Sequence, residues 1–301
     1  MFLGYNTNGL THHRLTDTVE LLAEIGYRGV AITIDHQALP PPEAIFEQSC
    51  HPAGEAESSD ARSADVAVLP AVVLDRLGRL KEQLEALQLQ SVIETGARFL
   101  LDPCKKHEPT LLTPAAEKRI LFYRYAIDCA AFLGSDCVSI WSGVLHPSVS
   151  RQEALTRLAI GLDEVLDYAA RKGVAIAFEP EPGMLIDSMA AFAELLDRID
   201  RPNLRLTLDV GHLHCQGETP IAAVIQQWAS RLGNVHLEDM CRGHHEHLMF
   251  GEGEIDFPPI FEALSEIGYS GGVYVELSRH SGEGLRAAKR AWEWLKSRAV
   301  R

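Results

Sequence analysis

The chain has 301 residues, 46% of them hydrophobic, so it is long enough for two ordinary domains or for one α/β barrel with a large core. Its formal net charge of −14 and its six scattered cysteines, which form no Cys-x-x-Cys pair, argue against a nonspecific grip on nucleic acid and against a zinc ribbon. No apolar run reaches the roughly 18 residues of a membrane span, and the first residues lack the features of a signal peptide, so we expect a cytoplasmic protein.

Short apolar runs alternate along the chain with longer amphipathic stretches, which is typical of βα units around a parallel sheet. The expected strands lie at residues 2–6, 29–35, 91–95, 137–141, 174–179, 204–209, 234–238 and 272–277. The expected helices lie at residues 16–25, 70–88, 115–133, 151–171, 188–199, 219–231, 258–267 and 281–298. Capping side chains or prolines precede several of these helices, and Gly26, Gly173 and Gly268 stand where three of them should end.

Eight βα units in one chain predict an α/β fold, a single (β/α)₈ TIM barrel over residues 1–301, because an open doubly wound sheet needs only about six strands. Two segments interrupt the repeat. Residues 48–65 are small and polar and are predicted to form a mobile insertion after the second strand. Residues 96–114 are predicted to form a long loop after the third strand. Both follow strands, so both are expected on the face of the barrel where active sites are built.

Four of the expected strands end in a side chain that can bind a metal ion: Glu179, Asp209, His236 and Glu276. A charged side chain is costly to bury at such a place unless it has a partner. The carboxyl ends of the last four strands of a barrel converge, so these side chains can reach one cation. Three carboxylates and one imidazole form a mainly hard site, which suits one Mn²⁺, Mg²⁺, Co²⁺ or Zn²⁺ ion with open positions for two neighbouring oxygens of a substrate.

Several segments of the chain resemble, in order, those of the xylose isomerase-like TIM barrel superfamily, which includes sugar phosphate isomerases and epimerases and AP endonuclease family 2 (endonuclease IV). These segments are Phe178-Glu179-Pro180, Leu208-Asp209-Val210-Gly211-His212, Val235-His236-Leu237-Glu238-Asp239, Gly251-Glu252-Gly253-Glu254-Ile255-Asp256-Phe257 and Tyr274-Val275-Glu276. The resemblance covers nearly the whole chain. It is specific for the superfamily because the motifs occur in the right order, but it does not select one activity.

The resemblance also implies roles for individual residues. In the ketose 3-epimerase branch, the positions that match the four strand-end residues bind a divalent metal ion, and those of Glu179 and Glu276 also move the proton. His212 and Arg242 match the substrate-binding histidine and arginine of that branch. The implied protein is a metal-dependent isomerase or epimerase of a small sugar, sugar phosphate or polyol ketone. His212 could instead orient Asp209, and Arg242 could be a solvated loop residue.

The chemistry of such a site follows from its residues. A cation that binds two neighbouring oxygens of a hydroxyketone stabilises the enediolate and lowers the cost of removing the intervening proton. A carboxylate is a weak base at neutral pH, so this activation of the proton is essential. Glu179 and Glu276, approaching from opposite sides, could then exchange protons with that carbon.

Three further candidates for substrate binding stand at or just after strand ends. Glu94 could bind a substrate hydroxyl or pair with Arg98. Arg98 could form a phosphate grip with Lys105 and Lys106, because a bidentate arginine matches phosphate oxygens, although loop lysines are more often solvated. Trp141 could stack on an apolar face of a sugar, or it could belong to the core.

The segment from Arg242 to His247 leaves the activity open. Endonuclease IV relatives place an Asp-x-His pair before the same glycine-rich turn to hold a further zinc ion, and His245 and His247 occupy these positions here, with histidine in place of aspartate. The other zinc-binding histidines of that enzyme are not evident, although His146 could replace one. The acidic chain also offers no broad phosphate-binding surface. His247 is therefore also a candidate for contact with a substrate.

Three alternatives to an isomerase or epimerase stay open: a lyase of the keto-inositol dehydratase type, a metal-dependent phosphodiester hydrolase of the endonuclease IV type, and a catalytically silent binding barrel. The expected partners are one divalent metal ion and a small carbohydrate, and we expect neither nucleic acid nor a membrane to bind. Phe2, Trp292 and Trp294 could pack against a second copy of the chain as readily as against the barrel, so a homo-oligomer is also left open.

Overall fold

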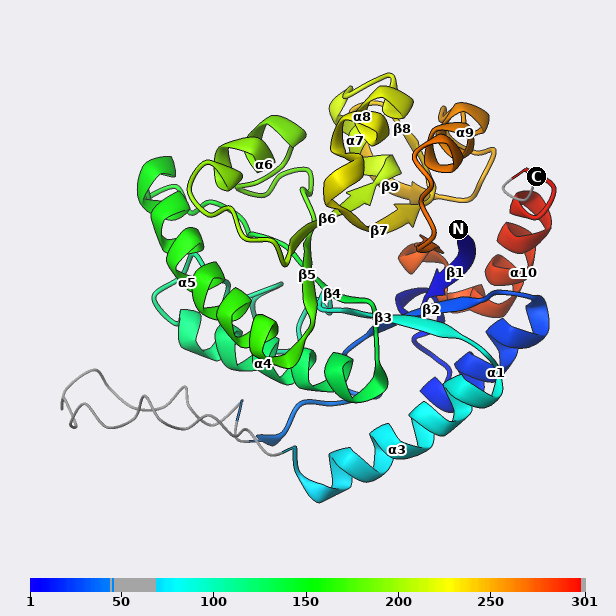
Figure 1. Ribbon diagram of the computed structural model, residues 1–301, viewed down its shortest axis with the longest axis horizontal. Coiled ribbons are helices and arrows are strands. Elements are labelled where there is room, and N and C mark those ends of the chain that lie inside the picture. Colours follow the sequence, from blue (N-terminus) through cyan, green and yellow to red (C-terminus); the bar gives the residue numbers. More distant parts are fainter. Residues whose placement is uncertain (44, 46–68, 299–301) are drawn as a thin grey trace.

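A computed structural model describes residues 1–43, 45 and 69–298, and in it eight strands close into a parallel barrel (Figure 1). The strands neighbour one another in the order β1-β10-β7-β6-β5-β4-β3-β2. Their bounds are β1 Phe2–Asn6, β2 Gly29–Thr33, β3 Gln90–Glu94, β4 Cys137–Ile140, β5 Ala175–Phe178, β6 Leu204–Asp209, β7 Leu232–Leu237 and β10 Gly272–Val275. The predicted (β/α)₈ barrel is confirmed, whereas the insertion predicted at 48–65 lies outside the described residues.

Helices surround the strands on the outside of the barrel (Figure 1). Their bounds are α1 Leu15–Ile25, α3 Ala71–Ala86, α4 Ala116–Leu133, α5 Arg151–Lys172, α6 Met189–Leu196, α8 Ile221–Trp228, α9 Pro258–Glu266 and α10 Gly284–Leu295. Helix α5 shows how the sequence sets these bounds. Ser150 Oγ accepts a hydrogen bond from Glu153 N at 3.2 Å, and the helix ends at Gly173, which has a φ of 69°. Among the described helices, none is long and apolar enough to cross a membrane.

The interior of the barrel is filled near the amino ends of its strands. The buried side chain of Tyr274 lies there in a cluster with Ala31, Val92, Cys137 and Ala177. Glycines make room for this ring, because a Cβ atom on Gly4 would clash with it and one on Gly272 would lie 2.5 Å from Tyr274 Cε2. Side chains that need access to solvent can therefore gather only at the carboxyl ends of the strands.

Two elements at the carboxyl end of the barrel were not predicted. Helix α7 (Val210–Gln216) begins directly after β6, where Asp209 Oδ1 accepts a hydrogen bond from His212 N at 2.7 Å and caps the helix. Strands β8 (Asp239–Cys241) and β9 (His244–Leu248) form an antiparallel hairpin through Gly243, whose φ is +74°. The stretch that the sequence suggested was a loop, from Arg242 to His247, is therefore mostly a strand.

The hairpin explains the segment from Gly251 to Phe257, one of the motifs that resemble the family. Asp239, the first residue of β8, accepts hydrogen bonds from Gly251 N at 2.8 Å through Oδ2 and from Ile255 N at 3.1 Å through Oδ1. A Cβ atom on Gly253 would clash with the same carboxylate. The segment from Gly251 to Phe257 thus wraps around Asp239 and holds β8 in place.

The three aromatic side chains considered as packing surfaces contact other aromatic residues of the same chain. The ring pairs, with their centroid distances, are Phe2–Tyr274 (6.3 Å), Trp292–Tyr27 (5.1 Å) and Trp294–Phe250 (5.1 Å). These contacts account for the positions of the three rings within a single copy of the chain.

Candidate metal centre and cavity

The four side chains predicted to bind a metal ion lie together at the carboxyl end of the barrel. Glu179 follows β5, Asp209 ends β6, His236 lies in β7 and Glu276 follows β10. The pairing of β6 with β7 sets Asp209 directly beside His236. One ligand atom from each of the four lies within 4.8 Å of the others. The structure thus brings the four residues into one group, three of whose members are buried.

His236 lies at the centre of this group. Its Nδ1 is 3.0 Å from Glu276 Oε2, 3.2 Å from Glu179 Oε1 and 3.8 Å from Asp209 Oδ2. Its other ring nitrogen, Nε2, donates a hydrogen bond to Glu94 Oε1 at 2.9 Å. In the neutral ring, the proton on Nε2 leaves a lone pair on Nδ1 that faces the three carboxylates.

A divalent cation fits this donor set. Asp209 Oδ2 is buried and has no hydrogen-bond partner in the described part of the chain. A lone pair that faces three carboxylates is unfavourable unless a proton or a cation lies between them. An ion bound by three carboxylate oxygens and one imidazole nitrogen would satisfy all four side chains, and such donors suit Mn²⁺, Mg²⁺, Co²⁺ or Zn²⁺.

The same crowding changes the proton affinities of the metal-free site. Burial raises the pKa of Glu179 well above its usual range, although His236 opposes the effect. Burial also acts against the ionisation of Glu276, but His236 outweighs it and holds the pKa of Glu276 below its usual range. Burial alone would lower the pKa of His236, yet Glu94 and the other carboxylates raise it well above the ordinary value. Binding of a cation must therefore displace protons, so metal affinity falls at low pH.

Glu94 acts on this site through His236. The buried Glu94 Oε1 accepts hydrogen bonds from His236 Nε2 at 2.9 Å and from Asn234 Nδ2 at 3.0 Å. A carboxylate in this position fixes the tautomer and the orientation of a metal-binding histidine. The sequence left open an ion pair between Glu94 and Arg98. That alternative is wrong, because no ion pair joins these two described residues and His236 takes the place of Arg98.

Two side chains that the sequence analysis did not select also hold the ligands. Asn8 Nδ2 donates a hydrogen bond to Glu276 Oε1 at 2.8 Å. Glu238 is fully buried in the strand-end segment after β7, and its Oε1 accepts a hydrogen bond from Gly211 N at 3.0 Å. Burial, and then the neighbouring Asp209, raise the pKa of Glu238 well above its usual range.

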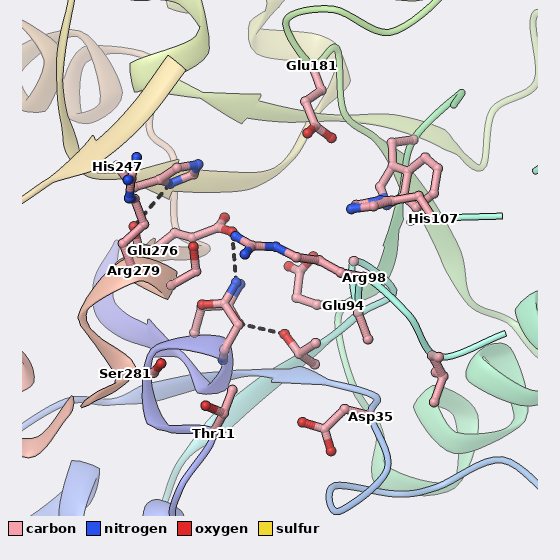
Figure 2. Close-up of a pocket in the computed structure, with 18 of the residues that line it drawn as sticks. Thr11, Asp35, Glu94, Arg98, His107, Glu181, His247, Glu276, Arg279 and Ser281 are labelled. Carbon is pink, nitrogen blue, oxygen red and sulfur yellow. Dashed lines mark hydrogen bonds between the residues drawn. The ribbon is translucent and has the colours of Figure 1, made fainter. Parts of the chain in front are cut away.

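A cavity of about 670 Å³ opens over the ligand group (Figure 2). Its volume is typical of sites for small molecules, which run from about 300 to 1,000 Å³. Five residues predicted to bind the substrate line it: Glu94, Arg98, Trp141, His212 and His247. The sixth, Arg242, is exposed and is not part of the lining. Its guanidinium lies against Gly217, at the end of α7, because the tight turn of the hairpin carries it there.

The model of the xylose isomerase-like TIM barrel family matches residues 19–298. The chain belongs to this family. Among curated members, the L-ribulose-5-phosphate 3-epimerase UlaE of Escherichia coli is 26% identical over 235 residues, which cover 75% of this chain and 82% of that protein. An inosose dehydratase of Lacticaseibacillus casei is 31% identical over 137 residues, but the match covers only 40% of this chain and 46% of the dehydratase.

Solved structures with the same barrel include a D-tagatose 3-epimerase-like protein, with a TM-score of 0.70, 22% identity and full coverage of both chains. They also include the IolI protein with a bound zinc atom, with a TM-score of 0.71, 20% identity and coverage of 99% of this chain and 98% of that one. At these identities the likeness shows the shared xylose isomerase-like fold.

A second group with metal-binding geometry lies beside the first. Ring nitrogens of His212, His245 and His247 lie within 4.8 Å of one another. His212 Nδ1 is 3.1 Å from the carbonyl oxygen of Pro180, and its Nε2 is 3.0 Å from His245 Nε2. Burial lowers the pKa of His212 to about 4 and also lowers that of His245, so both rings are neutral at pH 7. His146, the other histidine considered at the sequence level, is exposed and outside this group.

Trp141 borders the cavity as part of a packed wall. Only 4% of it is exposed, and its ring meets that of His107 edge-on at a centroid distance of 4.8 Å. The guanidinium carbon of Arg119 lies 5.0 Å from the centroid of Trp141. Of the two roles that the sequence left open for Trp141, the packing supports the core role.

Glu181 is a cavity residue that the sequence analysis did not select. Its side chain points into the cavity (Figure 2) and has no hydrogen bond or ion pair with any described residue. Burial, and then Glu276, raise the pKa of Glu181 to about 8, while Lys106 and Arg98 oppose this rise. The spacing contained a signal, because a residue two positions after Glu179 in an extended segment points to the same side.

Proposed function

We propose that the chain is a divalent-metal-dependent isomerase or epimerase of a small carbohydrate. The observation that carries this proposal is the group of one imidazole and three carboxylates at the floor of the cavity, with Glu179 and Glu276 both facing His236. A divalent ion held there would draw electrons from neighbouring oxygens of a hydroxyketone and so acidify the carbon-bound proton between them. The family membership and the sugar epimerases among the relatives support the same class of reaction.

In this proposal, Glu179 and Glu276 move the proton from one side of the substrate to the other. Both carboxylates approach His236 Nδ1, at 3.2 Å for Glu179 and 3.0 Å for Glu276, so both would lie beside a bound ion and its substrate. His212 and His247 line the cavity and, in this proposal, bind substrate oxygens.

The test is the exchange of substrate protons with solvent. The protein loaded with Mn²⁺ is incubated in D₂O with a panel of ketoses, and we expect deuterium at the carbon next to the carbonyl group. Metal analysis should find one ion per chain, whereas three ions would favour a nuclease-type centre. The proposal fails if the protein binds no metal after refolding with Mn²⁺, or if no ketose in a broad panel exchanges.

A dehydratase that acts on a keto-polyol such as a keto-inositol is the second candidate. Glu181 favours it, because a carboxyl group that faces the cavity and has a pKa of about 8 carries a proton at neutral pH and can protonate a leaving hydroxyl. Loss of water from a keto-inositol, followed by mass spectrometry, would support this reading. Glu181→Gln should then stop dehydration while leaving proton exchange in place. Metal binding without either reaction would instead indicate a silent binding barrel.

The proposal also covers the setting of the reaction. We place it in the cytoplasm with a carbohydrate as the partner, and the described cysteines, which are all free, are compatible with a reducing compartment. The four candidate ions can be distinguished by the rate of exchange with each metal in turn.

A further inference from the structure

Two cations on the wall formed by the loop after β3 have no partner. Arg98 and Lys106 both line the cavity, and neither side chain has a hydrogen bond or an ion pair with any described residue. Figure 2 shows that Arg98 extends from this loop into the cavity. The third cation of the lining, Arg279, differs because it pairs with Glu246 at 2.9 Å. Arg98 and Lys106 are thus the cations of the lining that are free to bind a ligand.

The loop that carries this pair is held in place. His107 N donates a hydrogen bond to Arg98 O at 2.5 Å, which brings the two ends of the segment 98–107 together and sets Lys106 next to Arg98. Arg119 on α4 is buried and donates to His107 O at 2.8 Å and to Pro109 O at 2.7 Å. A cation pair on a fixed backbone loses less conformational freedom when it binds an anion than one on a free loop.

Charge is distributed unevenly over the cavity. Its floor holds the carboxylates of Glu94, Glu179, Asp209 and Glu276, which outnumber the charges of one divalent ion. An anionic group is therefore repelled from the floor and attracted to the wall that carries Arg98 and Lys106. Glu181 faces the same space without a partner, and a carboxyl group can bind a sugar hydroxyl.

We propose that the substrate carries an anionic group, a phosphate or a carboxylate, at the end remote from the reacting carbon, and that Arg98 and Lys106 bind this group. The inference rests on the proposed function for the identity of the reacting end. It adds that the charge distribution orients the substrate, with its hydroxyketone toward the metal ligands and its anion at the loop. Glu181 binds a hydroxyl between the two ends.

Paired substrates test the proposal. For the metal-loaded protein, kcat/KM is compared between a ketose phosphate, the corresponding sugar with a terminal carboxylate, and the neutral ketose. We expect at least about a tenfold preference for one of the anionic substrates, since one charge-assisted contact accounts for roughly that factor. Arg98→Ala with Lys106→Ala should remove the preference for the anionic substrate, through a higher KM for that substrate. The better of the two anions identifies the group.

Lys105→Ala is the matched control. It removes the same charge one residue away, from a side chain that does not line the cavity, and should keep the preference for the anion. Equal kcat/KM values for anionic and neutral substrates in the unaltered protein would overturn the proposal. A preference that survives in the double variant, or is lost in Lys105→Ala, would overturn it as well.

A binding experiment separates this proposal from the proposed function. Calorimetric titration of the metal-loaded protein with glucose 6-phosphate, glucuronate and glucose requires no turnover. Tighter binding of one of the anionic sugars, lost in the Arg98→Ala/Lys106→Ala variant, would support the anion site even if no ketose exchanged its proton. Equal binding of the three sugars would refute the site even if exchange were found.

Discussion

The strand ends β5, β6, β7 and β10 and the loop after β3 form opposite kinds of wall around one cavity. At the strand ends, acidic side chains are mostly buried and contact His236 and Asn8. On the loop, Arg98 and Lys106 are exposed and unpaired, and only the backbone that carries them is fixed. The comparison separates two tasks under the proposed function: the strand ends would hold a metal ion and move a proton, whereas the loop would recognise the rest of the ligand.

The strongest challenge to this division is the replacement of the proton-moving carboxylates. Glu179→Gln and Glu276→Gln should each lower turnover about 1,000-fold, because acid–base groups contribute factors of about 10² to 10⁴. Glutamine has nearly the same shape, so both variants should keep the fold, although Glu276→Gln also loses the charge that pairs with His236. Turnover is measured by deuterium exchange and stability by urea unfolding. Glu85→Gln, at an exposed position of helix α3, is the control. An active Glu179→Gln/Glu276→Gln double variant would refute the assignment.

Replacing Arg119 tests whether its hydrogen bonds hold the loop after β3 in place. Arg119 is buried, and Arg119→Lys leaves the half-buried carbonyls of His107 and Pro109 with fewer donors, so we expect a loss of about 3 kcal/mol in the free energy of unfolding. Arg124→Lys, on the same helix, alters a partly exposed ion pair with Glu164 and a cation–π contact with Tyr168, and should cost about 1 kcal/mol or less. Urea unfolding measures both. Equal losses in the two variants would show that the loop has no special anchor.

Two substitutions of Glu94 test whether its carboxylate orients His236. Glu94→Leu removes the acceptor for His236 Nε2 and should weaken metal binding about 100-fold, and Glu94→Gln, which keeps an oxygen, about 10-fold. The affinity is measured by competition with a chelator, and the absorption spectrum of bound Co²⁺ reports the ligand geometry. Wild-type affinity in Glu94→Leu would mean that His236 is positioned without this bond.

The smallest expected effect at neutral pH concerns His107 on the loop wall, because its contribution develops only below about pH 6.5. Burial, followed by the nearby cations, lowers the pKa of His107 to about 3 from an ordinary 6.5. The unfolded chain therefore binds one more proton than the folded chain between these values, so stability falls as the pH drops from 6.5 toward 3. The slope from this residue is about 1.4 kcal/mol per pH unit. His107→Leu should flatten the pH dependence of urea unfolding by this amount, and an unchanged slope would contradict it.

The sequence predicted the elements that a short stretch of neighbouring residues is enough to identify. Each strand of the barrel is a run of apolar residues bounded by turn signals, so both the strands and the residues at their ends could be located. Helix α7 was missed because seven residues are too few to show a helical period, and the hairpin because its longer strand, His244–Leu248, is mostly polar and has no apolar run. The turn of this hairpin directs Arg242 away from the cavity. The sequence could not show this, because only the spacing of Arg242 from His236 was known.

The sequence also could not predict roles that depend on contacts between residues far apart in the chain. Glu94 and His236 are 142 positions apart in the chain, so their hydrogen bond becomes evident only when the barrel closes. Asn8 meets Glu276 across 268 positions. The sequence suggested that Arg98, Lys105 and Lys106 together bind a phosphate, because they lie close to one another in the chain. The structure keeps Arg98 and Lys106 as candidates and removes Lys105, which does not line the cavity.

Asp209 links the ligand group to a neighbouring helix. Its Oδ1 caps α7, and its Oδ2 is the buried oxygen that has no partner. The two oxygens move as one rigid group, so any rotation of the carboxylate toward an ion also shifts the acceptor of the first amide bond of α7. The exchange rate of the His212 amide hydrogen should therefore report whether the neighbouring metal site is filled, without substrate and without turnover.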